Sequence, residues 1–203
     1  MGIEPASAPT VTTEPAPAGD PPVSAPTTLQ LLAEDFETHG RDLLEPGLWA
    51  VATHRIGTRA LDPNRPRAER AVLDVLYKVM FTGVDWVCGI HLPRTVALGR
   101  RVRIWHKGCM LLTAKSIGND VHLRHDTTFG PVRAGRAVMA EGAVPPDAEL
   151  PIIEDGADVG SGVCVLGGVR VGRGAFVGAN SVVLKNVPPA ATVLGVPARI
   201  VPR

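Results

Sequence analysis

The C-terminal half of the chain places an aliphatic residue at every sixth position. The step is carried by Ile153, Val159, Val165, Val171, Val177 and Val183. Glycine often follows these positions, and a residue without a Cβ suits a tight corner. Neither an α-helix nor a β-hairpin has a six-residue period, whereas a parallel β-helix of short strands and corners does. The period therefore predicts a mainly β fold in which three hexapeptides complete one coil and the aliphatic side chains point inward.

The same step extends upstream, at Leu98, Ile104, Ile117, Leu123 and Phe129. It fails in residues 131–150, where Gly, Ala and Pro dominate. We therefore expect a β-helix over 89–186 with a long loop at 131–150 that leaves one corner, followed by a C-terminal tail at 187–203. Long loops on a rigid scaffold often carry binding residues.

The N-terminal part has a different composition. Residues 1–28 are rich in proline and alanine and hold almost no aliphatic side chains, so we expect a disordered tail. Residues 29–88 then show apolar positions at helical spacing, which predicts a small helical cap with Trp49 and Trp86 in its core. The cap is expected to hold three helices. The first begins at the capping residue Thr28 and ends at Gly40, the second covers about 48–61, and the third covers about 66–81.

Composition limits the classes of function. A chain of 203 residues has room for one sizeable core. Its formal charge of +1 and the lack of a basic block argue against nucleic acid or an anionic membrane as the main partner, so a small molecule is favoured. Three cysteines without a CxxC pair favour a reducing compartment, and no apolar run or leader indicates secretion or membrane insertion. We expect a cytoplasmic protein.

The stretch IWHKGCM, residues 104–110, holds a candidate catalytic side chain. His106 lies two residues after the inward Ile104, and His125 lies two after the inward Leu123. The two histidines should therefore occupy equivalent corners of successive coils. Spacing alone leaves three interpretations open for His106: an exposed corner residue, a general base, or a ligand in a three-histidine zinc site. His122 precedes Leu123 and should point elsewhere.

Several stretches resemble a known family, the left-handed β-helix acyltransferases with hexapeptide repeats, and within it the serine O-acetyltransferases. The resemblance rests on the repeats, on the loop after TTFG, on HRIG at 54–57 and on the ending SVVLKNVPPAATVLGVPARIV. It covers roughly residues 45–203. It implies a left-handed coil, a homotrimer, and an active site between neighbouring subunits where acyl-CoA lies in a groove.

The resemblance also implies roles for single residues. His106 takes the position of the catalytic histidine, a general base that deprotonates the acceptor as it attacks the thioester, without a metal or a covalent intermediate. His91 stands where the family carries the acidic residue that orients this histidine. The cofactor-binding candidates are small corner residues for the pantetheine arm and two cations for the phosphates or adenine of CoA: Gly130, Ser161, Gly178, Ala179, Lys185 and Arg199.

The departures from the family fall on the acceptor side. Trp105 replaces an aspartate, and Glu149-Leu150 replaces an Arg-His pair; the turn between His106 and Ile117 looks one residue short. We assign acceptor binding to Trp105 and His125. The resulting hypothesis is an acetyl-CoA-dependent O-acetyltransferase that acts on a small hydroxyl acceptor, by default serine. The alternatives are an acyltransferase for a sugar or for a specialised-metabolite hydroxyl or amine, or a β-helix metal protein similar to carbonic anhydrase.

Overall fold

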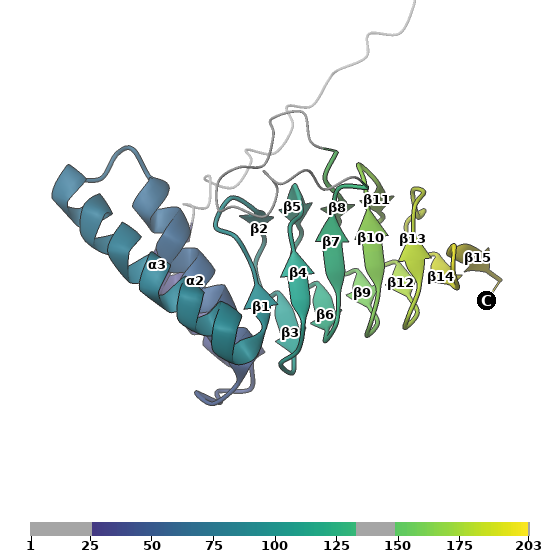
Figure 1. Ribbon diagram of the computed structural model, residues 1–203, viewed down its shortest axis with the longest axis horizontal. Helices are drawn as coiled ribbons and strands as arrows, with labels where there is room; N and C mark the ends of the chain where they lie inside the picture. The colour runs from purple at the N-terminus through teal and green to yellow at the C-terminus, as the bar shows by residue number, and fades with distance from the viewer. Residues whose placement is uncertain (1–25, 133–148, 203) are drawn as a thin grey trace, which may run out of the picture.

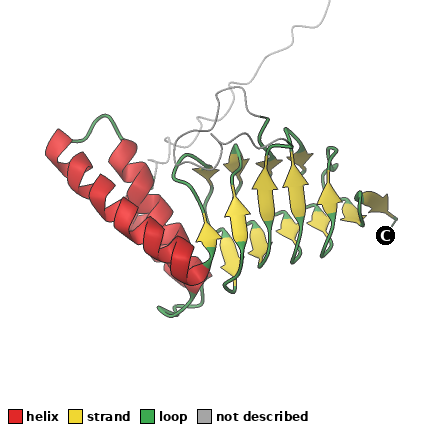
Figure 2. Cartoon of the chain, in the orientation of Figure 1, coloured by secondary structure: helices red, strands yellow, loops and turns green. Residues whose placement is uncertain are grey.

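The computed structural model describes residues 26–132 and 149–202. A helical unit packs against one end of a column of short strands, which runs away from the helices toward the C-terminus (Figure 1). Strands and turns alternate along the whole column (Figure 2). Most of the expected tail at 1–28 and of the expected loop at 131–150 lies outside the described residues, so both stay predictions.

The described residues form three helices: α1 (Thr28–Thr38), α2 (Pro46–Leu61) and α3 (Arg67–Cys88). Helix α1 begins at a capping box, in which the Thr27 hydroxyl accepts from the Gln30 N–H and the Gln30 side chain accepts from the Thr27 N–H. Helix α3 runs seven residues beyond the expected end at residue 81, because no strong stop occurs before Gly89, whose φ of +66° ends the helix. None of the described helices is long and apolar enough to cross a membrane.

One face of α3 carries an apolar stripe that the described part of the chain leaves exposed. The expectation that Trp49 and Trp86 belong to the core is wrong, because these residues are 44% and 83% exposed. Other exposed large apolar side chains lie along the same helix at helical spacing. Together with Trp86 they form what we call the α3 stripe: Val72, Val75, Leu76, Val79, Trp86 and Val87. Contiguous exposed apolar surface of this kind indicates an interaction site.

The rest of the chain is a parallel β-solenoid, which confirms the expected fold class. Its strands form a five-stranded sheet (β1-β4-β7-β10-β13), a four-stranded sheet (β11-β8-β5-β2) and a six-stranded sheet (β15-β14-β12-β9-β6-β3). Every pairing is parallel except that of β14 with β15. The bounds are β1 (Ile90–His91), β2 (Ala97–Leu98), β3 (Arg103–Trp105), β4 (Met110–Leu112), β5 (Ser116–Ile117), β6 (His122–Arg124), β7 (Thr128–Gly130), β8 (Ile152–Ile153), β9 (Asp158–Val159), β10 (Cys164–Leu166), β11 (Arg170–Val171), β12 (Phe176–Val177), β13 (Val182–Val183), β14 (Thr192–Leu194) and β15 (Arg199–Val201).

Inward-facing aliphatic residues stack as ladders through the solenoid. In the six-stranded sheet, Ile104 pairs with Leu123, which pairs with Val159, and all three are fully buried. Parallel pairing continues beyond residue 186, where the sequence places the end of the β-helix, because β14 adds to β12. The antiparallel strand β15 then lies along the last parallel strand.

Two columns of turns border the five-stranded sheet. The turns that lead into it from the six-stranded sheet form what we call the histidine edge: residues 106–109, 125–126, 161–162 and 179–180. The turns that leave it for the four-stranded sheet form the loop edge, where the segment 131–151 joins β7 to β8. The two edges lie on opposite sides of the five-stranded sheet.

Along the first coils, the six-residue step changes at two successive corners, the first of them on the histidine edge. Trp105 pairs with Arg124, while Leu111 pairs with Thr128. Between these two pairs, one coil holds five residues, 106–110, where the next coil holds three, 125–127. The next corner is one residue shorter than the repeat, since only four residues separate Leu112 from Ile117. Ile104 and Ile117 are nevertheless 13 positions apart, one more than two hexapeptides, so the stretch as a whole is not shorter than the repeat. The first of the two changes lies at the residue that the sequence singled out, His106.

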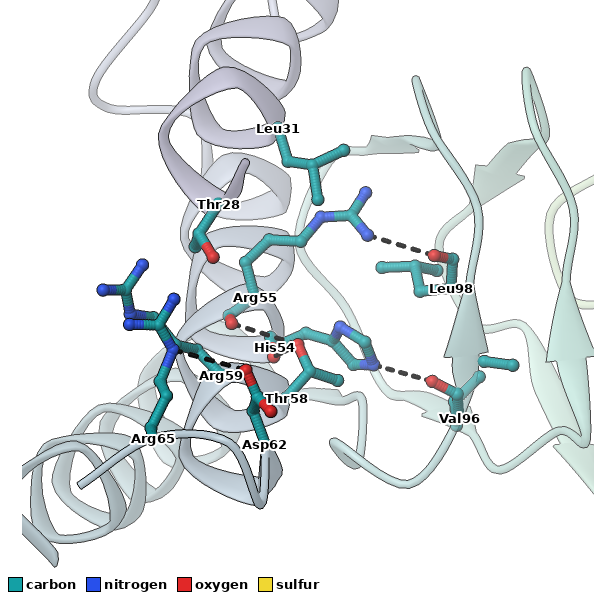
Figure 3. A pocket seen from close by; sticks show the side chains of 11 residues that line it. Thr28, Leu31, His54, Arg55, Thr58, Arg59, Asp62, Arg65, Val96 and Leu98 are labelled. Carbon is teal, nitrogen blue, oxygen red and sulfur yellow. Dashed lines mark hydrogen bonds and ion pairs between the residues drawn. The ribbon is translucent and has the colours of Figure 1, made fainter. Parts of the chain in front are cut away.

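Polar contacts hold the helical cap on the first coil (Figure 3). The buried Arg55 donates to the buried Asp35 and to the carbonyls of Leu98 and Gly99. His54 Nε2 donates to the Val96 carbonyl at 2.9 Å, and burial lowers the pKa of His54 to about 4. A cavity of about 430 Å³ opens beside these groups. None of the sequence-predicted site residues lines it, so we assign this junction to structure.

Candidate active site

A small cavity on the histidine edge brings together four of the sequence-predicted site residues, among them His106. Its volume is about 250 Å³, and its lining consists of Trp105, His106, Arg124, His125 and Ser161. Trp105 and Arg124 end adjacent strands, β3 and β6, while the other three lie in successive turns of the edge. Three successive coils thus contribute to one site, because parallel stacking repeats the same corner.

His106 lies exposed in the long turn, with a φ of +67°. Histidine is one of the few non-glycine types found with some frequency in this region. The turn continues through Gly108, where an added Cβ would lie 3.1 Å from the Cβ of His125. The extra residues therefore fold back onto the next coil. The ring centroids of His106 and His125 are 6.3 Å apart, and Ser161 Oγ lies 3.5 Å from His125 Nδ1.

Trp105 is held from two sides. Its indole N–H donates to His122 Nδ1 at 3.1 Å, and the Arg103 guanidinium lies over its ring, 4.0 Å from the centroid. Arg103 also donates to the carbonyl of Thr38 at the end of α1, which ties the indole to the cap. His122 faces Trp105 and does not line the cavity with His125, as the register led us to expect.

His91 lies apart from this cavity. It belongs to β1, its Nδ1 is 3.4 Å from Asp85 Oδ1, and its ring packs edge-on against Phe81 with centroids 5.0 Å apart. Among the described residues of one chain, no hydrogen bond, ion pair or ring contact joins His91 to His106. The orienting role of His91 therefore stays a prediction, and the carboxylate within its reach is that of Asp85.

The cofactor-binding candidates divide between the two edges. Ser161 lies on the histidine edge, and Gly178 and Ala179 lie at the same corner one coil further on. Gly130 ends β7 on the loop edge, where its carbonyl accepts from the Gly167 N–H.

The two cationic candidates meet near the C-terminal end of the solenoid. Lys185 follows β13 on the loop edge and Arg199 begins β15, and both line one cavity of about 390 Å³. A neighbouring cavity of about 320 Å³ is lined by Glu149 and shares Leu184 with it. The loop edge therefore carries a second, separate group of candidates.

Sequence reasoning missed Arg124. The only available signal was its position directly after the inward Leu123, which places it outward at the end of a strand that leads to the histidine edge. The described residues contain no group of three or more His, Cys, Asp or Glu side chains able to hold a metal. His122 Nδ1 is engaged by Trp105, so the described site offers no three-histidine zinc centre.

No family model matches the chain. Its sequence is 36% identical to a serine acetyltransferase of Bacillus licheniformis over 156 residues, which are 76% of this chain and 64% of the relative. It is 31% identical to a serine acetyltransferase of Mycobacterium tuberculosis over 179 residues, 88% of this chain and 66% of the relative. The fold resembles the soybean serine acetyltransferase apoenzyme with a TM-score of 0.68 and 28% identity, over 88% of this chain and 70% of that chain.

The chain thus spans just under two thirds of the length of these two relatives, 64% and 66%. Its parallel coils and repeated corners define a hexapeptide-repeat β-solenoid protein. Within that class, the chain is similar to serine acetyltransferases in both sequence and fold.

Proposed function

We propose that this chain is an acetyl-CoA-dependent O-acetyltransferase that acts on the hydroxyl of serine or a closely similar small acceptor. The observation that carries the proposal is the cavity of about 250 Å³ in which His106 meets Trp105, His125 and Ser161. Relatives named serine acetyltransferases, at 36% and 31% identity, support the reaction and the acceptor. Neutral imidazole at an exposed corner is suited to accept a proton from a hydroxyl group.

His106 performs the proton transfers in this proposal. As the acceptor oxygen attacks the thioester carbonyl, its proton passes to the His106 imidazole, and a carbon–oxygen bond forms. The carbon–sulfur bond then breaks, and the imidazolium returns the proton to the sulfur as CoA leaves. The thioester is already activated, so positioning of the two substrates supplies much of the remaining rate enhancement.

Trp105 and His125 bind the acceptor in this scheme. The indole is fixed by His122 and Arg103, so it forms a rigid wall beside the base. His125 lies on the coil that follows that of His106, and Ser161 Oγ lies 3.5 Å from its Nδ1. A pre-oriented pocket of this kind holds the hydroxyl near the base without a large entropic cost at each turnover.

The donor binds through small and cationic residues. The small corner residues proposed to lie along the pantetheine arm are Gly130, Ser161, Gly178 and Ala179. Gly130 has open space where a Cβ would stand, whereas at Gly178 that space is filled by the Leu194 side chain, so Gly178 can serve the arm only if Leu194 moves. Lys185 and Arg199 line the same cavity, where they form a cationic site suited to the phosphates of CoA.

The division of these residues between two edges supports a homotrimer. The histidine edge carries the base, while the loop edge carries Lys185 and Gly130. In a closed ring of three copies, the histidine edge of one copy can face the loop edge of the next and complete each site. The α3 stripe, with Trp86 83% exposed, supports self-association because the described residues of one chain leave it exposed.

We also place the protein in the cytoplasm. Its three cysteines, Cys88, Cys109 and Cys164, are free thiols in the structure. Free thiols are typical of a reducing compartment.

The test measures acetyl transfer by the full chain. Free thiol released from acetyl-CoA is followed with serine and with a panel of other hydroxyl and amine acceptors, and mass spectrometry identifies the acetylated product. We expect thiol release that depends on serine, with O-acetylserine as the product. Thiol release that no acceptor stimulates would overturn the proposal.

A further inference from the structure

We propose that Arg124 binds a carboxylate of the acceptor, so that the site selects hydroxy acids and does not require an ammonium group. This inference rests on the proposed acetyl transfer at His106. Arg124 ends β6 directly opposite Trp105 in the parallel register, and it lines the same cavity as His106. Its guanidinium therefore stands on the wall that an acceptor must touch to reach the base.

The guanidinium is fixed by the next coil. Arg124 Nη1 donates to Asp158 and to the Val159 carbonyl at 3.2 Å, and Nη2 lies 3.5 Å from the second carboxylate oxygen of Asp158. These contacts occupy the end of the guanidinium formed by its two terminal nitrogens. The ion pair thereby sets the direction in which the remaining N–H groups point.

One edge of this guanidinium remains available. Among the described residues, Arg124 Nε donates to no partner, and Nη2 has a second proton on the same side. Nε–H and Nη2–H together form a planar two-donor fork, which matches the two oxygens of a carboxylate. Arg124 can therefore hold Asp158 with one edge and a substrate carboxylate with the other.

The cavity offers an ammonium group no anionic partner. None of its five lining residues is acidic, so only neutral acceptors, Ser161 Oγ and the histidine ring nitrogens, stand on this wall. Glu149, which stands where the family has an arginine, lines a different cavity on the loop edge. Carboxylate recognition thus lies on Arg124 in this proposal, while the amine of an amino acid has no acidic partner among the described residues of this wall.

The experiment compares three acceptors that share one primary hydroxyl. Serine carries a carboxylate and an amine, 3-hydroxypropanoate only the carboxylate, and ethanolamine only the amine. Steady-state thiol release from acetyl-CoA gives kcat/KM for each with the full-length protein. We expect serine and 3-hydroxypropanoate to exceed ethanolamine by roughly tenfold to hundredfold, the effect of one charge-assisted hydrogen-bonded contact.

Variants assign this preference to Arg124. Arg124→Gln should remove most of the preference for the two acids over ethanolamine, through a higher KM for the acids. Arg124→Lys keeps the charge without the two-donor fork, so its preference should lie between those of the wild type and Arg124→Gln. Arg101→Gln is the matched control, because Arg101 also pairs with an aspartate, Asp120, but lies outside the cavity. It should leave the preference unchanged. Chemical unfolding of each variant separates lost recognition from lost folding.

The outcomes distinguish this inference from the proposed function. Equal use of all three acceptors, or an unchanged preference in folded Arg124→Gln, overturns the role of Arg124 while acetyl transfer stands. If Arg124→Gln does not fold, the role of Arg124 is tested by the order of the three acceptors with the wild type and by the preference of Arg124→Lys. If none of the three acceptors stimulates thiol release, both the proposed function and this inference are wrong.

Discussion

The solenoid and its junction with the helical cap are stabilised by different kinds of contact. Inside the solenoid, residues such as Phe129 and Val165 repeat the same apolar pairing from coil to coil. At the junction, a buried ion pair between Asp35 and Arg55 and a neutral buried His54 make contacts that occur once. Because its contacts repeat, the fold of the solenoid can be predicted from the sequence. The position of the cap depends on single contacts between distant residues, which only the structure shows. Four predictions test this difference, from the largest expected effect to the smallest.

A large cavity in the apolar ladder should cost the most stability. Phe129 is fully buried between Leu112 and Val165, so Phe129→Ala should lower the free energy of unfolding by about 3–5 kcal/mol. Phe176→Ala is the matched control, because Phe176 lies on the outer face of β12 with 37% of its surface exposed. Denaturant unfolding measures both, and a similar loss in the two variants would contradict the account of the ladder.

Breaking the buried ion pair should cost somewhat less. Asp35→Ala leaves the Arg55 guanidinium buried without its carboxylate, although the carbonyls of Leu98 and Gly99 still accept from it. We expect a loss of about 3 kcal/mol in the free energy of unfolding. Asp120→Ala, which breaks an exposed pair with Arg101, should cost no more than about 1 kcal/mol. Equal losses would show that burial does not set the strength of the junction.

Acid should loosen the junction before it affects the ladders. Burial lowers the pKa of His54 from 6.5 to about 4, so the unfolded chain binds its proton first as the pH falls. The stabilisation is complete above pH 6.5 and is lost progressively toward pH 4, by up to roughly 3 kcal/mol. His54→Gln should show a shallower fall in unfolding free energy over this range. The same slope in both proteins would exclude His54 as the titrating group.

Charge removal at the C-terminal end of the solenoid should have the smallest effect. Lys185 and Arg199 are exposed and line one cavity, so each single change to alanine should raise the KM for acetyl-CoA by about 3- to 10-fold, the range for one partly screened phosphate contact. The double variant should raise it further with little change in unfolding. Arg170→Gln, which removes an exposed charge outside that cavity, serves as the control and should leave this KM unchanged.

Sequence reasoning succeeded where the pattern repeats. The six-residue step predicted the ladders through Ile104, Leu123 and Val159, since every coil imposes the same requirement on its inward position. It also placed His106 and His125 on adjacent corners, and the structure puts both in one cavity.

It failed where a feature occurs once. The extra residues in the turn after Trp105 break the step, and the ion pair that orients Arg124 joins strands far apart in the chain. Trp86 was expected in the core because apolar periodicity does not distinguish an internal face from an exposed one. The local sequence around these residues does not predict such contacts.

The central claim is that chemistry lies on the histidine edge of the solenoid and is separate from what stabilises the fold. The most direct test measures, for His106→Asn, both thiol release from acetyl-CoA with serine and the free energy of unfolding. His106 is exposed, so unfolding should match the wild type within about 0.5 kcal/mol. Loss of the general base should lower kcat by about 10²- to 10⁴-fold. Equal thiol release by the two proteins would contradict the account.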